Sequence, residues 1–376
     1  MARLMIGAGG TGGHVYPALA VAEVLRKSAN YKHHLVFVGT RGGGGIERPL
    51  VTGANLDFDA YHEVFAGPIV GVNPFQLMSS LVKMGLGCLQ SFSLLLRERP
   101  QAILLTGGWA NVPLALAAWI RRIPMLVYLP DIEPGRTIQL LSKLNAKIAI
   151  TVPESSEYFR DGQSVVTGYP LRSEVTSANR LAAKQQFNLD PHRKTILVTG
   201  GSRGARTINI AIENNLAALL ELPVQVIHVT GKLDWERSQA QVQNAAYDTT
   251  HYHPFPYLES AEMGLAFAAA DIIVGRSGAS SIGEFPYFGA ASILVPYPYA
   301  WRYQKINADW LVTHGVGIRI NNEDMASDLL PTLAQLITDT VQLEQMQDCA
   351  KALFKGNGAD NLAQELLLLA GADSNG

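Results

Sequence analysis

Two glycine-rich segments carry the residue types that bind anions. The first spans residues 7–14 (GAGGTGGH) and the second spans residues 199–205 (TGGSRGA). Each follows a short apolar stretch and precedes a helical pattern. A strand that runs through glycines into a helix brings unblocked backbone N–H groups and the positive end of the helix dipole to one place. Both segments therefore predict binding sites for a phosphate or a similar anion.

His14 ends the first segment, just inside the predicted helix. A histidine titrates near neutral pH and can accept the proton of a hydroxyl group. The helix N-terminus would lower its pKa and keep the imidazole neutral, as a general base must be. We interpret His14 as a candidate catalytic base; the alternative is that it only binds a phosphate or caps the loop.

Gly7, Gly9 and Gly12 match the spacing of the dinucleotide-binding fingerprint, which alone is a weak signal. That fingerprint also needs a carboxylate at the end of the second strand to hold a ribose, and residues 38–41 read VGTR. The sequence contains no Gly-Lys-Ser/Thr, which a nucleoside triphosphate P-loop requires. The remaining alternative to an anion site is that the glycines only form tight turns.

The elements around these segments are those of an α/β protein with two domains. The chain has 376 residues, 48% of them hydrophobic and 16% charged, and a net charge of −2, which gives no overall basic surface for nucleic acid. The two cysteines, Cys88 and Cys349, have no metal-binding spacing and indicate a reducing compartment. We expect no signal peptide and no membrane-spanning segment.

Strand and helix patterns alternate along the chain, which predicts parallel sheets with crossover helices. We expect an N-terminal domain over residues 1–167, a C-terminal domain over 168–350, and a last helix within 351–376 that returns to the first domain. The expected strands cover residues 4–8, 34–39, 102–106, 125–128, 147–151, 195–199, 224–230, 271–275 and 291–295. The expected helices include residues 15–27, 75–99, 112–121, 137–144 and 361–369.

Five segments, in the same order, resemble the MurG-type glycosyltransferases of family 28. They are residues 9–20 (GGTGGHVYPALA), 167–172 (TGYPLR), 200–205 (GGSRGA), 276–284 (RSGASSIGE) and the 295–308 loop with its VPYPY start and later Gln and Asn-Ala. Each match alone is modest, but five in order are specific. The resemblance implies the GT-B fold: two Rossmann-like parallel-sheet domains that face an interdomain cleft. It also implies an acceptor site in the first domain and a UDP-sugar site in the second.

The resemblance implies a donor site built from helix N-termini and a few side chains. The leaving diphosphate gains negative charge, which N–H groups and arginines stabilise. Glu284 would hold the ribose, Gln304 the sugar hydroxyls, and the backbone near Leu258 the uracil. The alternatives are a solvated surface arginine at 172 and a carboxylate at 284 that only favours its helix N-terminus. The donor-binding candidates are Thr11, Gly12, Gly13, Arg172, Ser202, Arg203, Gly204, Leu258, Ser277, Gly278, Ala279, Glu284 and Gln304.

The acceptor side departs from the family pattern. Family members commonly carry a His-Glu pair where this chain has Tyr128-Leu129, and an Asn where it has Asp131. Asp131 is therefore a second candidate base and acceptor-binding residue. Gly108 and Trp109 resemble the family's acceptor-side glycine turn.

The motif Asp57-Phe58-Asp59 formally matches the DxD metal site of another glycosyltransferase class. It lies in an alternating, strand-like run whose period places both acids on a solvated face. We therefore expect neither a metal ion nor another cofactor, because the GT-B design uses helix dipoles and arginine instead.

An apolar loop precedes the long helix 75–99. We expect Ile69, Val70, Val72 and Phe75 to face a membrane, near basic residues of which Lys83 is the closest in sequence. The helix as a whole is interpreted as a crossover helix buried on the sheet. Its apolar stripe consists of Met78, Leu81, Val82, Leu89, Phe92 and Leu96.

The resemblance therefore implies an inverting transferase that moves N-acetylglucosamine from UDP-GlcNAc to undecaprenyl-diphosphate-MurNAc-pentapeptide (lipid I), giving lipid II for peptidoglycan. It would work as a peripheral protein on the cytoplasmic face of the cell membrane. Its partners would be UDP-GlcNAc, lipid I, that membrane surface and other cell-wall enzymes, without nucleic acid. Two alternatives stay open: a GT-B enzyme with a different lipid or small-molecule acceptor, and a non-catalytic sugar-nucleotide-binding scaffold.

Overall fold

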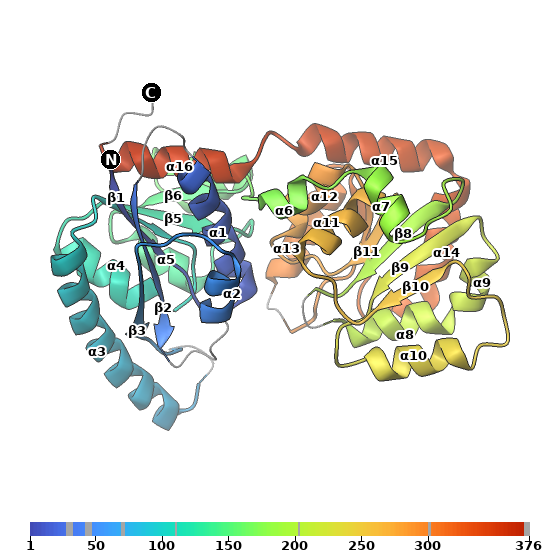
Figure 1. Cartoon of the computed structure of the whole chain (residues 1–376), viewed down its shortest axis with the longest axis horizontal. Helices are drawn as coiled ribbons and strands as arrows, with labels where there is room; N and C mark the ends of the chain where they lie inside the picture. Colours follow the sequence, from blue (N-terminus) through green and yellow to red (C-terminus); the bar gives the residue numbers. More distant parts are fainter. Residues whose placement is uncertain are drawn as a thin grey trace. The chain divides into compact units, whose positions relative to one another are not determined.

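The computed structural model describes residues 1–27, 33–41, 47–68, 72–109, 111–201, 204–299 and 302–371. The chain forms two compact units (Figure 1). Unit 1 comprises Met1–Arg172 and Gly356–Gly376, and unit 2 comprises Ser173–Lys355. The divisions expected from the sequence, after residues 167 and 350, lie a few residues before these boundaries.

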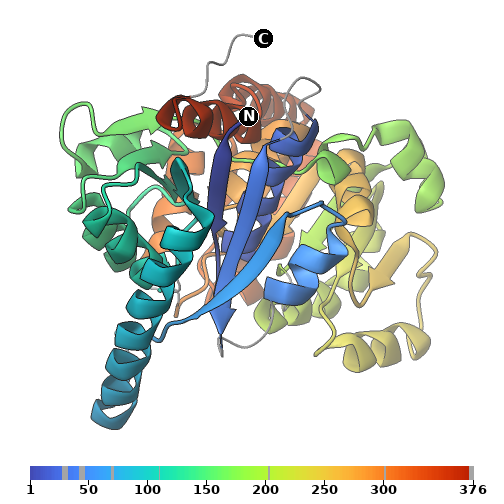
Figure 2. The same cartoon turned by 60° about the vertical axis from the view of Figure 1, so that its left-hand side comes forward.

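Unit 1 is built on a parallel sheet that, in its described residues, has seven strands in the order β3-β2-β1-β4-β5-β6-β7 (Figure 2). The central strands are almost wholly apolar and buried, as expected for a sheet covered by helices on both faces. The sequence analysis did not predict β3 and β7, the two strands at the ends of this order. The strands are β1 (Arg3–Gly7), β2 (His34–Arg41), β3 (Ala60–Phe65), β4 (Ala102–Leu105), β5 (Met125–Leu129), β6 (Lys147–Ile150) and β7 (Ser164–Val166).

The helices of unit 1 include one from the far end of the chain. Helix α16 packs against α1 and against strands β4 and β5. Its Glu365 also forms an ion pair of 2.6 Å with Lys147 on β6. The helices are α1 (Gly12–Lys27), α2 (Glu47–Gly53), α3 (Pro74–Glu98), α4 (Asn111–Ile120), α5 (Arg136–Ser142), the 3-10 helix η1 (Pro153–Tyr158) and α16 (Gly358–Leu369).

Helix α3 corrects one expectation, because its apolar stripe does not lie on the sheet. It packs against α4 and β3 through a face that includes the small residues Ser80, Gly87 and Ser91, and a Cβ on Gly87 would lie only 1.9 Å from the carbonyl oxygen of Phe65. That close approach buries Ser80, Ser91 and Leu95, and turns the large apolar side chains outward. The exposed residues are Phe75, Met78, Leu81, Val82, Leu86, Leu89, Phe92 and Leu96.

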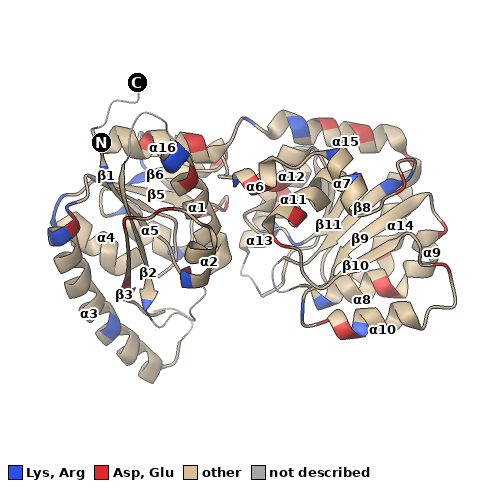
Figure 3. Cartoon of the chain, viewed as in Figure 1, with Lys and Arg blue, Asp and Glu red and all other residues tan. Residues whose placement is uncertain are grey.

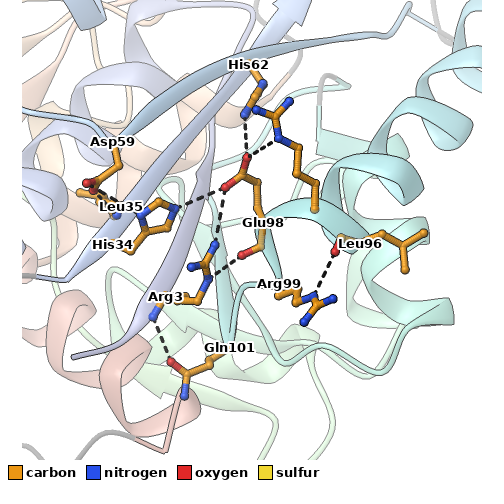
Figure 4. Close-up of polar contacts among 10 residues, drawn as sticks. Arg3, His34, Leu35, Asp59, His62, Leu96, Glu98, Arg99 and Gln101 are labelled. Atoms are coloured by element: carbon orange, nitrogen blue, oxygen red, sulfur yellow. Dashed lines mark hydrogen bonds and ion pairs between the residues drawn. The ribbon is translucent and has the colours of Figure 1, made fainter.

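The C-terminal end of α3 is tied to the starts of three strands by Glu98 (Figure 4). The buried Glu98 carboxylate accepts contacts of 3.3 Å from Nε2 of His34 on β2 and from Nε2 of His62 on β3. Arg3 on β1 adds a contact of 3.8 Å. This polar cluster lies at the N-terminal edge of the sheet.

Asp59, the second acid of the formal DxD motif, also has a structural role. It accepts hydrogen bonds from the backbone N–H of Leu35, at 2.8 Å, and from the Arg26 guanidinium, at 2.7 Å. The expected strand-like run over residues 55–61 is mostly loop, because β3 begins only at Ala60. Asp59 thus fastens this loop to β2.

Unit 2 repeats the architecture with a parallel sheet whose described strands follow the order β10-β9-β8-β11-β12-β13. Its strands are β8 (Lys194–Thr199), β9 (Val224–Val229), β10 (Tyr252–Phe255), β11 (Ile272–Gly275), β12 (Ala291–Leu294) and β13 (Gly317–Arg319). Its helices are α6 (Ser173–Thr176), α7 (Arg180–Gln186), α8 (Arg206–Asn214), α9 (Leu216–Leu220), α10 (Trp235–Gln243), α11 (Ser260–Ala269), α12 (Ser281–Phe288), α13 (Tyr303–Thr313), α14 (Met325–Thr338) and α15 (Thr340–Leu353).

Both sheets reverse their strand order at one place, between β1 and β4 in unit 1 and between β8 and β11 in unit 2. In open α/β sheets, ligands bind beyond the carboxyl ends of the strands at such a switch point. The two glycine-rich segments leave β1 and β8, so each lies at the switch point of its own sheet.

Candidate active site

Two glycine turns pack against each other at the switch point of unit 1. One follows β1, and the other, Gly107-Gly108, follows the neighbouring strand β4. Both glycines have left-handed backbone angles, with φ of 105° and 83°. A Cβ on Gly107 would lie 3.0 Å from Cδ2 of His14, and one on Gly108 would lie 2.7 Å from the carbonyl oxygen of Gly9. Only glycine permits this approach, which seats the His14 ring between the two turns.

The contacts of His14 assign its proton. Its Nδ1 lies 3.2 Å from the carbonyl oxygen of Gly9 and 3.3 Å from Oγ1 of Thr11. Because a carbonyl oxygen only accepts, the first contact places the proton on Nδ1 and leaves Nε2 with its lone pair. Burial lowers the pKa of His14 and outweighs the opposite effect of the bond to Gly9. The imidazole is therefore neutral at physiological pH, with a ring nitrogen that can accept a proton.

Three buried polar side chains that the sequence analysis missed hold this arrangement. Oγ1 of Thr106 donates to the carbonyl oxygen of His14 at 2.7 Å, and Nδ2 of Asn111 donates to that of Gly107 at 2.6 Å. The Glu47 carboxylate accepts the N–H of Gly10 at 2.8 Å. Thr106 and Asn111 had a local signal, as polar residues at a strand end and a helix start, whereas Glu47 had none.

The acceptor-side candidates lie at the same edge of the unit 1 sheet. Trp109 is partly buried and packs against a small apolar cluster that includes Met84 and Val112. Asp131 follows β5, the neighbour of β4, and is partly exposed. Buried Ser155 braces the backbone there by donating to the carbonyl oxygen of Ile132 at 2.8 Å.

The departure at Tyr128-Leu129 is a change of core and not an exchange of site groups. Both side chains are fully buried in β5. The Tyr128 hydroxyl lies 3.0 Å from Oγ1 of Thr151, and burial raises the pKa of Tyr128 well above its usual value.

In unit 2, the turn between β8 and α8 presents backbone groups to solvent. Gly201 and Gly204 have left-handed φ angles of 78° and 76°, while a Cβ on Gly200 would lie 2.1 Å from the backbone nitrogen of Ala205. Ala205 is the N-cap of α8 and makes no side-chain cap bond, and a helix start of this kind can bind an anion. The expected residues Ser202 and Arg203 lie outside the described residues.

A second helix start follows β11, and its first N–H groups bond the carbonyl oxygens of residues 278–280. Ser280, the N-cap of α12, makes no side-chain cap bond, and a Cβ on Gly278 would meet no atom within 4 Å. Glu284 lies in the first turn of α12 and is partly exposed, as is Ala279 before it. Ser277 is fully buried, and its hydroxyl donates to the carbonyl oxygen of Gln304 at 2.7 Å.

Gln304 holds the loop between β12 and α13. Its Oε1 accepts the N–H of Tyr297 at 2.9 Å, so its amide NH₂ is the group that it can offer to a sugar hydroxyl. The Arg276 guanidinium braces the same loop by donating to the carbonyl oxygen of Val295 at 3.1 Å, and burial lowers the pKa of Arg276.

The remaining candidates divide between the two units. Leu258 has its side chain in the core of unit 2, which leaves only its backbone for a ligand. In unit 1, the Arg172 guanidinium lies 4.0 Å from the centre of the Tyr16 ring on α1. Thr11 and Gly13 are exposed and Gly12 is partly exposed at the start of that helix.

The expected membrane patch is described only in part. Ile69 and Val70 lie outside the described residues, Val72 is partly exposed, and Phe75 is 90% exposed. Within the described residues, no group of three or more His, Cys, Asp or Glu side chains could hold a metal ion.

Comparison with known proteins identifies the family. The N-terminal domain of glycosyltransferase family 28 matches residues 4–150, and the C-terminal domain of that family matches residues 195–366. A UDP-N-acetylglucosamine--N-acetylmuramyl-(pentapeptide) pyrophosphoryl-undecaprenol N-acetylglucosamine transferase from Roseiflexus sp. is 34% identical, over 96% of this chain and 93% of the relative. An enzyme of the same name from Desulforudis audaxviator is also 34% identical, over 98% of this chain and 99% of the relative.

The solved structures agree. MurG from Acinetobacter baumannii superimposes with a TM-score of 0.76 at 25% identity, covering 97% of this chain and 99% of that chain. A kitacinnamycin glycosyltransferase, at 15% identity and a TM-score of 0.70, shares the fold. Two parallel-sheet α/β units, both family 28 domains and full-length relatives at about one third identity all lead to one assignment. The chain belongs to glycosyltransferase family 28, to the MurG-type N-acetylglucosaminyltransferases with the GT-B fold.

Proposed function

We propose that this chain transfers N-acetylglucosamine from UDP-GlcNAc to lipid I with inversion at the sugar. The acceptor hydroxyl forms a bond to C1 of the donor sugar while the bond from C1 to the diphosphate oxygen breaks. The hydroxyl proton passes to a base, and UDP leaves with the bonding electron pair. The observation that carries this proposal is the match along almost the whole chain to enzymes named for this reaction.

The helix starts of unit 2 support the donor half of the proposal. The departing diphosphate gains charge, and preorganised N–H groups stabilise that charge more in the transition state than in the bound substrate. Helix α8 begins without a side-chain cap, so its first turn can serve this purpose. In α12 the first N–H groups bond the carbonyl oxygens of residues 278–280, so this helix start contributes its dipole. Glu284 has the carboxylate needed to accept two ribose hydroxyls, and Gln304 offers its amide NH₂ to the sugar.

The histidine of unit 1 supports the acceptor half. His14 is neutral, its Nδ1 proton is engaged by Gly9, and its Nε2 has an open lone pair, which together describe a positioned general base. Asp131 is the second candidate, since it lies at the same edge of the sheet. We assign the base role to His14 because it is fixed by contacts with two glycine turns.

We further propose that the protein works at the cytoplasmic face of the membrane and docks there through α3. Among the described helices, α3 alone is long and apolar enough to cross a membrane, yet 33% of its apolar window is buried in unit 1. Its outer face is about 37 Å long by helix rise and carries few charges (Figure 3). A helix that packs on one side and is apolar on the other fits a membrane surface.

Basic side chains adjoin this apolar face. The Arg121 guanidinium lies 5.5 Å from the centre of the Phe92 ring, Arg122 follows it, and Lys83 lies on α3 itself. The exposed Trp119 and Ile120 at the end of α4 extend the apolar surface beside α3. Apolar burial with nearby positive charge is the combination that binds anionic lipid surfaces.

Vesicle flotation tests the docking surface. The double variant Leu81→Glu and Leu89→Glu should abolish binding to vesicles of phosphatidylglycerol and phosphatidylcholine, because it places two carboxylates on the apolar face. The matched control is Leu181→Glu with Leu233→Glu, two exposed leucines of unit 2, which should leave binding intact. Equal binding of both double variants would remove α3 as the docking surface.

The reaction is tested by UDP release with three possible acceptors. The protein and UDP-GlcNAc are incubated with a lipid I analogue, with a diacylglycerol, or with neither. Rapid release only with the lipid I analogue supports the proposal, and release only with diacylglycerol shows a different acceptor. Tight UDP binding without release in any arm shows a sugar-nucleotide-binding scaffold.

A further inference from the structure

Three buried polar side chains form a hydrogen-bonded row, the polar row, in unit 2 behind the donor turn. It runs from Tyr252 on β10 through His228 on β9 to Asn209 on α8. His228 and Asn209 are fully buried, and Tyr252 is 5% exposed. None of the three is placed to touch the donor, and a polar residue in the interior of a sheet is costly unless each of its groups is paired.

The donor and acceptor groups fix the direction of every hydrogen bond in the polar row. Nδ2 of Asn209 donates to the carbonyl oxygen of Thr230 at 2.8 Å and to the Asp234 carboxylate at 2.9 Å. Its Oδ1 must therefore accept from Nε2 of His228 at 3.0 Å. Nδ1 of His228 is then an acceptor, and the Tyr252 hydroxyl donates to it at 2.7 Å.

The protonation states of His228 and Tyr252 are equally defined. Burial lowers the pKa of His228 to about 3, and burial also raises the pKa of Tyr252. The imidazole is thus neutral and the phenol protonated at physiological pH. The hydrogen bonds keep this one direction under working conditions.

Asn209, the last residue of the polar row, is linked to the donor turn through Thr230. Thr230 follows β9, and its carbonyl oxygen, which Asn209 holds, is the atom against which Gly204 packs. A Cβ on Gly204 would lie 2.3 Å from that oxygen and 3.0 Å from Cα of Gly231. A shift of the Thr230 carbonyl would therefore move Gly204, and with it the turn that leads into α8.

We propose that Asn209, oriented by His228 and Tyr252, is the positioning residue that fixes Gly204, and with it the start of α8, for the donor diphosphate. The proposal rests on the proposed function, because it gives the donor turn the diphosphate as its ligand. Asn209 acts through the Thr230 carbonyl and does not contact the substrate. The polar row thereby sets the positions of backbone N–H groups, and their stabilising effect on the diphosphate depends on how they are oriented.

The test compares Asn209→Leu with the loss of a similar set of buried hydrogen bonds at Gln225, a residue of β9. Gln225 is also fully buried. Its side-chain amide forms hydrogen bonds with Asp190 and Thr195, near the end of β9 that is farther from the donor turn. Asn209→Leu should weaken UDP binding and raise the KM for UDP-GlcNAc by about tenfold or more, with the acceptor KM unchanged. Gln225→Leu should lower the melting temperature while UDP binding stays at the wild-type value.

A second pair of variants separates positioning from general packing. In His228→Gln, an amide N–H can donate to Asn209 and an amide oxygen can accept from Tyr252, so donor affinity should return to near wild type. His228→Leu offers neither group and should resemble Asn209→Leu. The pair differs in hydrogen bonding at similar side-chain size.

Each outcome decides a different question. Unchanged UDP affinity in Asn209→Leu, or equal loss in His228→Gln and His228→Leu, would overturn the positioning role alone. Loss of UDP affinity in Gln225→Leu equal to that in Asn209→Leu would also overturn it, since the effect would then follow stability. A wild-type protein that neither binds UDP nor consumes UDP-GlcNAc would instead reject the proposed function.

Discussion

The same strand–glycine–helix pattern occurs at the switch points of both sheets, yet the two copies present different chemistry. In unit 1, the space beside the turn is filled by His14 and by the Gly107-Gly108 turn, and the Gly10 N–H is taken by Glu47. In unit 2, the turn has no such occupant in the described residues, and α8 begins without a side-chain cap. The first copy offers a proton acceptor, whereas the second leads into a helix start without a side-chain cap.

This difference teaches that a glycine-rich turn does not by itself determine its ligand. The ligand also depends on the neighbouring strand, because the residues that follow that strand lie at the same switch point. β4 brings two more glycines that seat an imidazole, while β11 brings a second uncapped helix start at α12.

His14→Ala should reduce kcat by about 10²- to 10⁴-fold, because a general base typically contributes that much. UDP affinity should not change, since the donor turn belongs to unit 2. Steady-state kinetics with a lipid I analogue and calorimetry with UDP measure the two quantities. A loss of only a few fold in kcat would remove His14 as the base.

Gly204→Ala and Gly201→Ala form a matched pair in the donor turn. Both glycines have left-handed backbone angles, so each alanine costs about 1–2 kcal/mol. A Cβ at 204 also meets the Thr230 carbonyl oxygen, whereas one at 201 meets no atom within 4 Å. UDP binding should therefore fall much further in Gly204→Ala than in Gly201→Ala, and equal losses would contradict a turn fixed by Thr230.

The pH dependence of kcat should identify the base in unit 1. A base must be deprotonated, so kcat falls as the pH drops through its pKa. Because burial lowers the pKa of His14, the acid limb should lie below the ordinary histidine value of 6.5. Asp131→Asn should keep this limb in place, and its disappearance in that variant would transfer the role to Asp131.

Glu98→Gln should affect stability and not catalysis, because Glu98 lies at the sheet edge opposite the site. Burial raises the pKa of Glu98, but the hydrogen bonds from His34 and His62 outweigh it and lower the pKa overall. A carboxylate with a lowered pKa stabilises the fold above its unfolded pKa of about 4.3, and loses that effect as the pH falls through the folded value.

Urea unfolding at several pH values measures this effect. At pH 7 the variant should lose about 1–3 kcal/mol of unfolding free energy, and the difference from wild type should shrink below about pH 4. A constant difference across this range would show that the charge of Glu98 is not what stabilises the end of α3. Its kcat at pH 7 should equal that of the wild type.

Much of the fold followed from local patterns. The central strands are continuous apolar runs between glycines and helical segments, and that pattern needs no tertiary information. The short strand β13 and the edge strands β3, β7 and β10 were missed, because three or four residues, or a half-exposed face, give little periodicity. The outward stripe of α3 was misjudged for another reason. The burial of that helix depends on Gly87 meeting the Phe65 backbone, which no helical pattern encodes.

Local residue types at fixed spacing were enough to identify the two glycine turns, the histidine after the first and the carboxylate in α12. Only the tertiary structure decided what surrounds them. It brought Gly107 to the His14 ring, Glu47 to the Gly10 N–H and Asn209 to the Thr230 carbonyl. Those pairs lie far apart in the chain and meet because parallel strands place their carboxyl ends at one edge, which local sequence does not specify.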